Sequence, residues 1–399
     1  MENSLKATRV SEHVWWVGAV DWAIRDFHGY ATDRGSTYNA YLVMADKVTL
    51  IDTVKAPFRG EMMARIASVV DPAKVEYVVS NHSEMDHSGS LPETIAALRP
   101  SRVLASKMGV RALAAHFGLD GIEAVGTGDS LDLGNMKLDF LETRMLHWPD
   151  SMVSYLAADR LLFSQDGFGM HLASSERFAD ELDPAVLRQE AAKYYANILL
   201  PFSPLVTKLL ATVAEMKLDI AFLCPDHGPT WRKGFDILGW YGRWAEQKPT
   251  RKAVVTYATM WNSTALMANS IADGLAEAGA DVKVMPLGPA HRSDVITELL
   301  EAGALLVGSP TINNQMFPTM ADFLCYARGL KPQNLVGQVF GSYGWSGEAC
   351  KQMTAELAAM KVEPVGEPVR VNYVPGEAAL AQCRALGLAV GKRLAESAG

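Results

Sequence analysis

The sequence has few cysteines and no cysteine pair. Only four cysteines occur among its 399 residues, at Cys224, Cys325, Cys350 and Cys383. The absence of a C-x-x-C motif argues against a zinc ribbon, a thioredoxin-type redox site and the cysteine-held iron of a rubredoxin. With so few cysteines, the sequence also shows no sign of the disulfide framework of a small secreted domain. We therefore expect four buried or partly buried thiols.

Long apolar runs and runs of one charge are also missing. The first twenty residues contain no basic stretch followed by an apolar one, and no later stretch is long enough to span a bilayer. The 37 basic and 45 acidic residues give a net charge of −8, without a cluster of Lys or Arg. We expect a cytoplasmic protein with neither a membrane nor a nucleic-acid partner.

Two styles of pattern meet near residue 250. The length predicts two domains, and 49% hydrophobic residues suffice for a large core in each. Before residue 250, short strands such as 38–43 and 77–80 alternate irregularly with helices such as 184–200 and 234–247. After the polar segment 246–252, strands and helices alternate regularly, which predicts a parallel sheet covered by helices on both faces. We place the domains at 1–249 and 250–399.

A dense group of metal-ligand residue types follows the strand predicted at 77–80. Residues 81–89 read Asn-His-Ser-Glu-Met-Asp-His-Ser-Gly, so His82, Glu84, Asp86 and His87 fall within six residues. We expect them on a loop. Imidazoles and carboxylates at this density repel or desolvate one another unless a cation lies between them. The segment therefore indicates a metal site.

Three further candidate ligands stand alone at the ends of later predicted strands. His147 follows 138–142, Asp166 follows 161–164, and His227 follows 220–224 in the turn Pro-Asp-His-Gly. One cluster and three isolated residues at separate strand ends suit a two-metal centre. Any one of them alone would be an ordinary polar loop residue.

The order H-x-E-x-D-H, then H, D and H, resembles the flavodiiron branch of the metallo-β-lactamase superfamily. The hydrolases of that fold carry H-x-H-x-D-H, and Glu84 stands here in place of the second histidine. A mixed set of histidines and carboxylates suits iron better than zinc. The resemblance implies an α/β protein, with an N-terminal metallo-β-lactamase-like αββα sandwich and a C-terminal flavodoxin-like doubly wound parallel sheet.

The resemblance also implies a ligand set for two iron ions per subunit. His82, Glu84 and His147 would hold one iron, Asp86 and His227 the other, and Asp166 would bridge them. His87 either binds the second iron or donates a hydrogen bond to a ligand.

Three loops after the strands of the C-terminal domain resemble FMN-binding loops of flavodiiron flavodoxin modules. The first precedes a helix and offers hydroxyl and amide groups without a cation, as a phosphate loop can. The other two stand where a doubly wound sheet binds its ligand. The residues expected to bind FMN are Thr259, Met260, Trp261, Asn262, Ser263, Thr264, Ser309, Pro310, Thr311, Asn313, Ser342, Tyr343, Gly344, Trp345 and Gly347. Singly, the first loop would be a helix cap and the aromatic residues would be packing.

The family resemblance implies a reaction and its partners. The expected reaction is reduction of O2 to water, of NO to N2O, or of both, with electrons passing through FMN. The donor would be a separate protein such as rubredoxin, or a reduced carrier such as the deazaflavin F420H2. A head-to-tail homodimer, or a homotetramer made of two such dimers, would bring each flavin to the partner's iron.

His28 and Tyr195 are the candidate catalytic residues, because they lie in segments that resemble the substrate side of the family's pocket. Each could donate a proton or hydrogen-bond bound oxygen. Tyr194 is expected to pack, His171 to support the site, and Trp148 either to pack or to lie between flavin and iron.

Two other functions remain open from the sequence. The first is a zinc hydrolase with a regulatory flavin domain, against which Glu84 argues. The second is a flavodoxin-like electron carrier with a vestigial metal domain, against which the complete ligand set argues.

Overall fold

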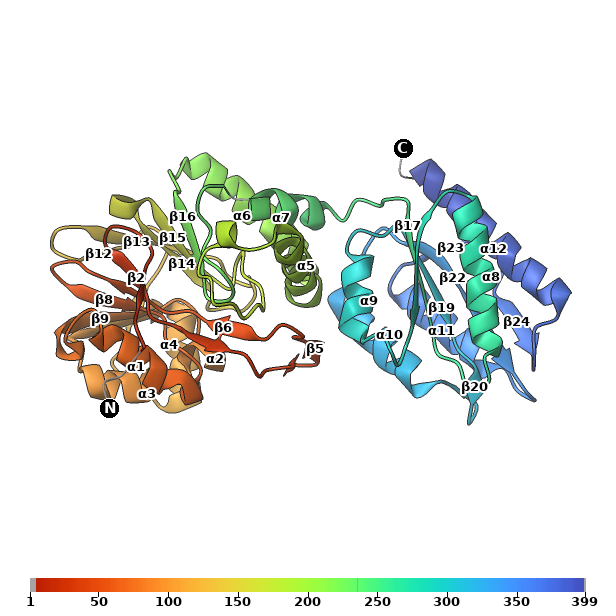
Figure 1. Ribbon diagram of the computed structural model, residues 1–399, viewed down its shortest axis with the longest axis horizontal. Coiled ribbons are helices and arrows are strands. Elements are labelled where there is room, and N and C mark those ends of the chain that lie inside the picture. Colours follow the sequence, from red (N-terminus) through yellow and green to blue (C-terminus); the bar gives the residue numbers. More distant parts are fainter. Residues whose placement is uncertain (1–4, 235, 398–399) are drawn as a thin grey trace. The chain divides into compact units, whose positions relative to one another are not determined.

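A computed structural model describes residues 5–234 and 236–397 (Figure 1). The chain forms two compact units. The first comprises the chain up to His28, then Thr32–Tyr194 and Pro204–Gly242; the second comprises Gly29–Ala31, Tyr195–Ser203 and the chain from Arg243 onward. The linker at 246–252 remains our proposal for the domain boundary.

The first unit contains two large β-sheets. A seven-stranded sheet has the order β1-β2-β7-β8-β9-β10-β11, and a five-stranded sheet has the order β12-β13-β14-β15-β16. The strands of the first are β1 Thr8–Arg9, β2 Val14–Trp16, β7 Tyr41–Val43, β8 Val48–Ile51, β9 Val75–Ser80, β10 Arg102–Ser106 and β11 Glu123–Val125. Those of the second are β12 Ser130–Asp132, β13 Lys137–Glu142, β14 Met152–Leu156, β15 Leu161–Gln165 and β16 Phe222–Pro225.

Apolar side chains fill two layers around the first sheet. One core joins residues of both sheets, including Tyr41, Val79, Phe140 and Phe163. The other lies between the first sheet and the helices α1 Arg59–Ala67, α3 Leu91–Leu98 and α4 Lys107–Phe117, which cover its outer face (Figure 1). Burial on both faces explains why β8 and β9 are rich in apolar and β-branched residues rather than alternating. The expected αββα sandwich is present.

Helices α5 Pro184–Tyr194, α6 Ser203–Met216 and α7 Asp236–Glu246 follow later in the chain. A π-helical turn, Tyr195–Leu199, and a 3₁₀ turn, Leu200–Phe202, separate α5 from α6. Four short strands lie between β2 and β7: β3 Ala19–Asp21, β4 Asp26–Phe27, β5 Tyr30–Ala31 and β6 Ser36–Tyr38, of which β5 belongs to the second unit.

The second unit contains a parallel sheet. Strands run in the order β18-β17-β19-β22, and β23 and β24 both pair with β22 in parallel. Helices α8 and α12 pack together on one face, and α9, α10 and α11 cover the other (Figure 1). The expected doubly wound sheet is therefore present. Its strands are β17 Lys252–Tyr257, β18 Asp281–Pro286, β19 Ala304–Gly308, β22 Val336–Tyr343, β23 Glu363–Pro364 and β24 Val369–Asn372, with the hairpin β20 Thr311–Ile312 and β21 Gln315–Met316. Its helices are α8 Ser263–Glu277, α9 Arg292–Leu299, α10 Pro318–Leu330, α11 Glu348–Ala359 and α12 Glu377–Ser397.

Four sequence-based expectations differ from the structure. Cys325 is exposed, so the expectation of four buried or partly buried thiols is correct only for Cys224, Cys350 and Cys383. The strand expected at 38–43 is divided between β6 and β7. The helix expected at 184–200 leaves the α-helical form after Tyr194, where the π turn begins. The loop expected at 81–89 contains the one-turn helix α2, Met85–Ser88. The helix expected at 234–247 is present as Asp236–Glu246, and residue 235 lies outside the described residues.

Among the described residues, one helical run, Pro184–Met216, is long and apolar enough to cross a membrane. It also carries Glu190 and Lys193, both buried and ion-paired with Arg34 and Asp33 respectively. Charged side chains along a run of this length suit a helix packed inside a protein, so the run is weak evidence for a membrane span.

Candidate metal centre and flavin pocket

The seven predicted metal-ligand residues converge in the first unit. His82 and Glu84 lie between β9 and α2, and Asp86 and His87 lie within α2. The remaining three, His147, Asp166 and His227, follow β13, β15 and β16. Gly228 ends this last turn at a φ of +77°, where a Cβ would come within 2.8 Å of the Met170 carbonyl oxygen. Glycine is therefore required beside His227.

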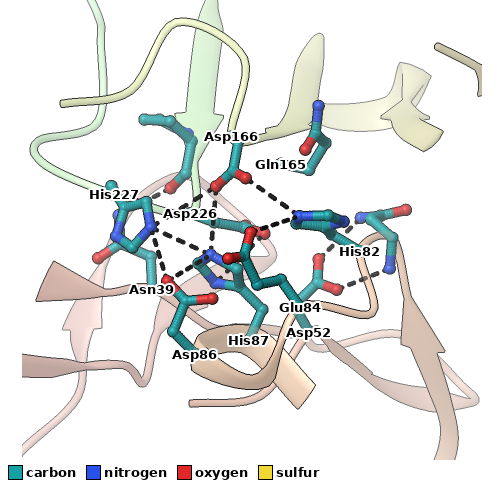
Figure 2. Close-up of polar contacts among 12 residues, drawn as sticks. Asn39, Asp52, His82, Glu84, Asp86, His87, Gln165, Asp166, Asp226 and His227 are labelled. Atoms are coloured by element: carbon teal, nitrogen blue, oxygen red, sulfur yellow. Dashed lines mark hydrogen bonds and ion pairs between the residues drawn. The ribbon is translucent and has the colours of Figure 1, made fainter. Parts of the chain in front are cut away.

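The ligand atoms form two groups. One contains His82, Glu84, His147 and Asp166, and the other contains Asp86, His87 and His227; within each, the candidate ligand atoms lie within 4.8 Å of one another. Six of the seven residues are buried. Figure 2 shows most of these side chains turned toward a common centre. This is the arrangement expected for two neighbouring metal ions.

Asp166 lies between the two groups. Its Oδ2 atom is 3.2 Å from His82 Nε2 and 3.0 Å from His147 Nε2. Its Oδ1 atom is 3.2 Å from His87 Nε2 and 3.6 Å from His227 Nε2 (Figure 2). One carboxylate thus faces both groups, as a bridging ligand must.

Protein groups alone do not satisfy this cluster. Nε2 of His87 lies 3.1 Å from Nε2 of His227, and both face Asp86 Oδ2, at 3.4 and 3.1 Å. Yet both Asp86 oxygens and Asp166 Oδ1 accept no hydrogen bond with acceptable geometry from any described residue. Buried acceptors are normally satisfied, so these atoms need a cation. The donor set, nitrogen and carboxylate oxygen without sulfur, fits iron.

Electrostatics within the cluster is strongly coupled. Burial alone would lower the pKa of His87, but Asp86 and Asp166 outweigh it and raise that pKa to about 9. Burial would also lower the pKa of His147, but Asp166 and Glu84 outweigh burial and raise that pKa to about 9. In return, His87 and His82 overcome the effect of burial and hold the pKa of Asp166 well below its ordinary value. A bound metal would take the place of the protons that these histidines otherwise hold.

Sequence reasoning missed three buried carboxylates around the cluster. Asp150 Oδ2 lies 3.1 Å from His82 Nδ1 and accepts a hydrogen bond from the Ser83 backbone N–H at 2.6 Å. Asp52 accepts two hydrogen bonds from Asn81, and Asp226 Oδ2 lies 3.7 Å from His87 Nδ1 (Figure 2). In the sequence, Asp150 and Asp226 stand out only because they lie near candidate ligands, and many surface residues do so as well.

The two candidate catalytic residues have different surroundings. His28 has a positive φ of 54°, and its Nε2 lies 3.1 Å from Glu84 Oε1, with 73% of its side chain exposed. Tyr195 belongs to the other compact unit, where its hydroxyl lies 3.0 Å from Ser203 Oγ and its ring packs on Trp244. The structure therefore places His28 against a candidate ligand but gives Tyr195 a packing environment.

Tyr194, which the sequence analysis assigned to packing, is the tyrosine beside the cluster. Its ring centroid lies 5.2 Å from that of His171 and 6.1 Å from that of His227. Burial, followed by the charge of Asp166, raises the pKa of Tyr194 well above its ordinary value, so the hydroxyl keeps its proton. His171, as expected, supports the site: its Nδ1 lies 2.8 Å from Ser36 Oγ, which is itself 3.3 Å from His227 Nδ1. Trp148 packs edge-on against His82 at 5.3 Å.

The second unit has a cavity of about 480 Å³ at the carboxyl ends of its parallel strands. That volume suits a small cofactor. Eleven of the predicted flavin-site residues line it: Thr259, Met260, Trp261, Ser263, Pro310, Thr311, Asn313, Ser342, Tyr343, Gly344 and Trp345. Asn314, Ser346, Tyr373 and Val374 line it as well and were not predicted.

Four predicted flavin-site residues do not line the cavity and have other contacts. Asn262, at a φ of +67°, precedes α8, and Thr264 Oγ1 lies 3.3 Å from Ser342 Oγ. The hydroxyl of Ser309 donates to the Pro310 carbonyl, and the carbonyl of Gly347 accepts from Arg370 at 3.3 Å. Asn262, Ser309 and Gly347 stand in the loops around the cavity, and Thr264 stands in the first turn of α8.

The cavity has features that fit FMN. Thr259 Oγ1 is buried and has no hydrogen-bond partner among the described residues, as a hydroxyl awaiting a phosphate would. Two tryptophans of the lining, Trp261 and Trp345, are 88% and 89% exposed. Aromatic rings with this degree of exposure are suited to stack on a planar ring.

Comparisons with known proteins agree with both halves. Residues 37–228 match the ODP family beta lactamase model, and residues 255–387 match the flavodoxin model. The chain is 45% identical to a nitric oxide reductase of Moorella thermoacetica, over 97% of this chain and 98% of that protein. It is 42% identical to a rubredoxin-oxygen oxidoreductase of Megalodesulfovibrio gigas, over 98% of each chain. The crystal structure of the flavodiiron protein from Giardia intestinalis matches with a TM-score of 0.93 and 32% identity, over 98% of each chain.

Proposed function

This chain belongs to the flavodiiron protein family, and we propose that it reduces O2 to water, NO to N2O, or both, at a pair of iron ions that FMN supplies with electrons. The observation that carries the proposal is the position of Asp166, whose two oxygens face the two groups of candidate ligands. Such a carboxylate suits two metal ions that act together on one substrate. Relatives over nearly the full length carry both activities in their names, so both gases stay in the proposal.

The proposed ligand sets follow from these distances. His82, Glu84 and His147 would hold one iron, Asp86, His87 and His227 the other, and Asp166 would bridge them. The cluster contains no thiol, and some of its carboxylate oxygens accept no hydrogen bond from the described residues. Both features support iron over zinc. When bound, the iron pair and FMN supply the redox chemistry, and the protein supplies position, protons and exclusion of water.

Residues around the centre have roles that the chain itself supports. His28, exposed and in contact with Glu84, is proposed to bring protons from solvent to the substrate side. Tyr194 keeps its hydroxyl proton and is proposed to donate a hydrogen bond near the metal pair. Tyr195 has no catalytic role in this proposal, because its hydroxyl lies 3.0 Å from Ser203 Oγ.

FMN is proposed to bind in the cavity of the second unit. The loop before α8 would hold its phosphate through backbone N–H groups, Thr259 and Ser263, since no cation lines the cavity. Trp345 and Tyr343 would contact the ring system.

The partners and location are proposals as well. We propose a separate electron donor, either rubredoxin or a reduced carrier such as F420H2, and a cytoplasmic location. We also propose a head-to-tail homodimer or homotetramer, because the exposed tryptophans of the flavin pocket offer an apolar rim for a second subunit. Sedimentation analysis of the holoenzyme would give a single monomeric species if this assembly is wrong.

The test of the proposed function is stopped-flow oxidation of the fully reduced holoenzyme with each gas in turn. We expect flavin reoxidation within the enzyme's turnover time and consumption of at least one gas. Asp166→Ala, with FMN retained, should abolish gas consumption. Undiminished turnover in that variant would instead support the electron-carrier alternative.

A further inference from the structure

Asp226 is a buried carboxylate that the proposed ligand sets do not use. It is 1% exposed, and neither of its side-chain oxygens accepts a hydrogen bond from any described residue. Its backbone is fixed on both sides, since its N–H donates to the Gln165 carbonyl and its carbonyl accepts from the Asn39 N–H. A carboxylate held in such a place without a donor is costly, which calls for an explanation.

A candidate ligand lies beside this carboxylate. Asp226 Oδ2 lies 3.7 Å from Nδ1 of His87, and that nitrogen likewise has no hydrogen-bond partner among the described residues (Figure 2). The other ring nitrogen, Nε2, faces Asp86, Asp166 and His227. The imidazole thus stands between the orphaned carboxylate and the metal centre.

Two other histidines of the centre have the same arrangement. His82 has its Nδ1 at 3.1 Å from Asp150 Oδ2, and His227 has its Nδ1 at 2.6 Å from the Thr37 carbonyl oxygen. In both, an acceptor faces Nδ1 while Nε2 faces the centre. An acceptor at Nδ1 fixes the tautomer, because the proton stays on Nδ1 and the lone pair of Nε2 is left for a metal.

We propose that Asp226 is the positioning residue of His87: its carboxylate, 3.7 Å from Nδ1, favours the ring proton on that nitrogen and so leaves the lone pair of Nε2 for the second metal ion. The separation of 3.7 Å is longer than a hydrogen bond, so His87 is held less tightly than His82 or His227. This inference rests on the proposed diiron site and gives a physical reason for placing His87 among the ligands of the second iron.

Asp226 is the carboxylate beside Nδ1 of His87. A second carboxylate, Asp52, already has two donors from Asn81, so it does not compete for His87. Among the described residues the Nδ1–H of His87 therefore has Asp226 as its one carboxylate neighbour.

The test is an anaerobic Fe(II) titration of apoprotein that retains FMN, in competition with a chelator. Asp226→Asn should lower the affinity of one of the two iron-binding steps by about ten- to a hundredfold and leave the other step unchanged. Asp150→Asn is the matched variant, since it removes the acceptor of His82 and should weaken the other step. Asp120→Asn, at an exposed position, should change neither.

A double-mutant cycle separates positioning from a general effect of charge. In the His87→Ala background, Asp226→Asn should change iron affinity less than about twofold, because its partner is gone. An equal loss in both backgrounds, or no loss in the single variant, would overturn the proposal.

A measurement on the unaltered chain covers the case in which Asp226→Asn does not fold. In ¹⁵N-histidine-labelled, Zn(II)-loaded protein, nuclear magnetic resonance should find His87 protonated at Nδ1 and metal-bound at Nε2. A proton on Nε2 would overturn the inference. If the unaltered protein binds fewer than two iron ions, the proposed function fails; if it binds two and Asp226 is without effect, this inference alone fails.

Discussion

In the N-terminal half the candidate site is a set of buried ionisable side chains, whereas in the C-terminal half it is an open pocket lined by hydroxyls, amides and aromatic rings. The first site draws ligands from segments as distant as His82 and His227, and its charges balance only around a cation. The second uses loops after parallel strands and no charged side chain. The difference follows from the cofactors: metal ions are held by side-chain charge, and a phosphate is held by backbone dipoles.

The largest effect is expected from exchanging Glu84 for the residue that the hydrolases of this fold carry. Glu84→His replaces a hard oxygen donor by a nitrogen, so iron should give way to zinc. Gas consumption should fall at least about a hundredfold, while FMN stays bound. Metal analysis and an oxygen electrode check this.

The same substitution at an exposed glutamate on α3, Glu93→His, is the control and should leave metal content unchanged. Retention of two irons and full turnover in Glu84→His would show that this carboxylate does not select the metal.

In the flavin half the largest effect is expected at Thr259. Its buried hydroxyl has no partner among the described residues, and a hydrogen bond to a charged phosphate is worth about 1.5–3 kcal/mol. Thr259→Ala should therefore weaken FMN binding by about ten- to a hundredfold, and Thr259→Ser should restore it. Fluorescence titration of deflavinated protein measures this, and unchanged affinity in Thr259→Ala would remove this residue from the phosphate loop.

A smaller effect is expected at the rim of the flavin pocket. Trp345 is 89% exposed, so Trp345→Ala should change the free energy of unfolding by less than about 0.5 kcal/mol. Loss of aromatic stacking should still weaken FMN binding by about threefold to tenfold. Trp22→Ala, an exposed tryptophan of the metal half, should leave FMN affinity unchanged. Equal effects of the two variants would contradict the assignment.

The smallest effect concerns pH and only the metal half. His87 and His147 have pKa values of about 9, above the ordinary 6.5. In metal-free protein the folded state therefore holds protons that the unfolded state has lost, so their stabilisation is complete below pH 6.5 and disappears as pH rises through 9. The Tm of the metal half should fall by at least about 5 °C over this range. Calorimetry should find no such fall for the metal-loaded protein; an equal fall would place these histidines away from the metal.

Local sequence patterns predicted the candidate ligands but not every other side chain that faces the candidate metal centre. The seven candidate ligands were identified because residue type and order carry that signal. The structure places Tyr194 beside the candidate ligands and the hydroxyl of Tyr195 beside Ser203, and a π turn, which helical periodicity does not reveal, begins at Tyr195. Asp226 was not predicted, because its proposed role depends on the imidazole of His87, which lies 139 residues earlier in the chain.

The flavin loops show the same limit in another form. Sequence placed the three loops after strands, and topology brought them together. It could not tell that the hydroxyls of Thr264 and Ser309 contact Ser342 and the Pro310 carbonyl instead of lining the cavity, nor that Tyr373 and Val374 join the lining from the segment after β24. Those choices depend on backbone dihedrals and on packing between loops.

Metal analysis of holoenzyme purified without added metal, combined with Mössbauer spectroscopy, tests the central claim most directly. We predict two iron ions and one FMN per chain, with the irons magnetically coupled through a shared carboxylate. Protein that is folded and holds FMN but contains zinc, or fewer than two iron ions per chain after iron loading, would contradict a diiron centre at Asp166.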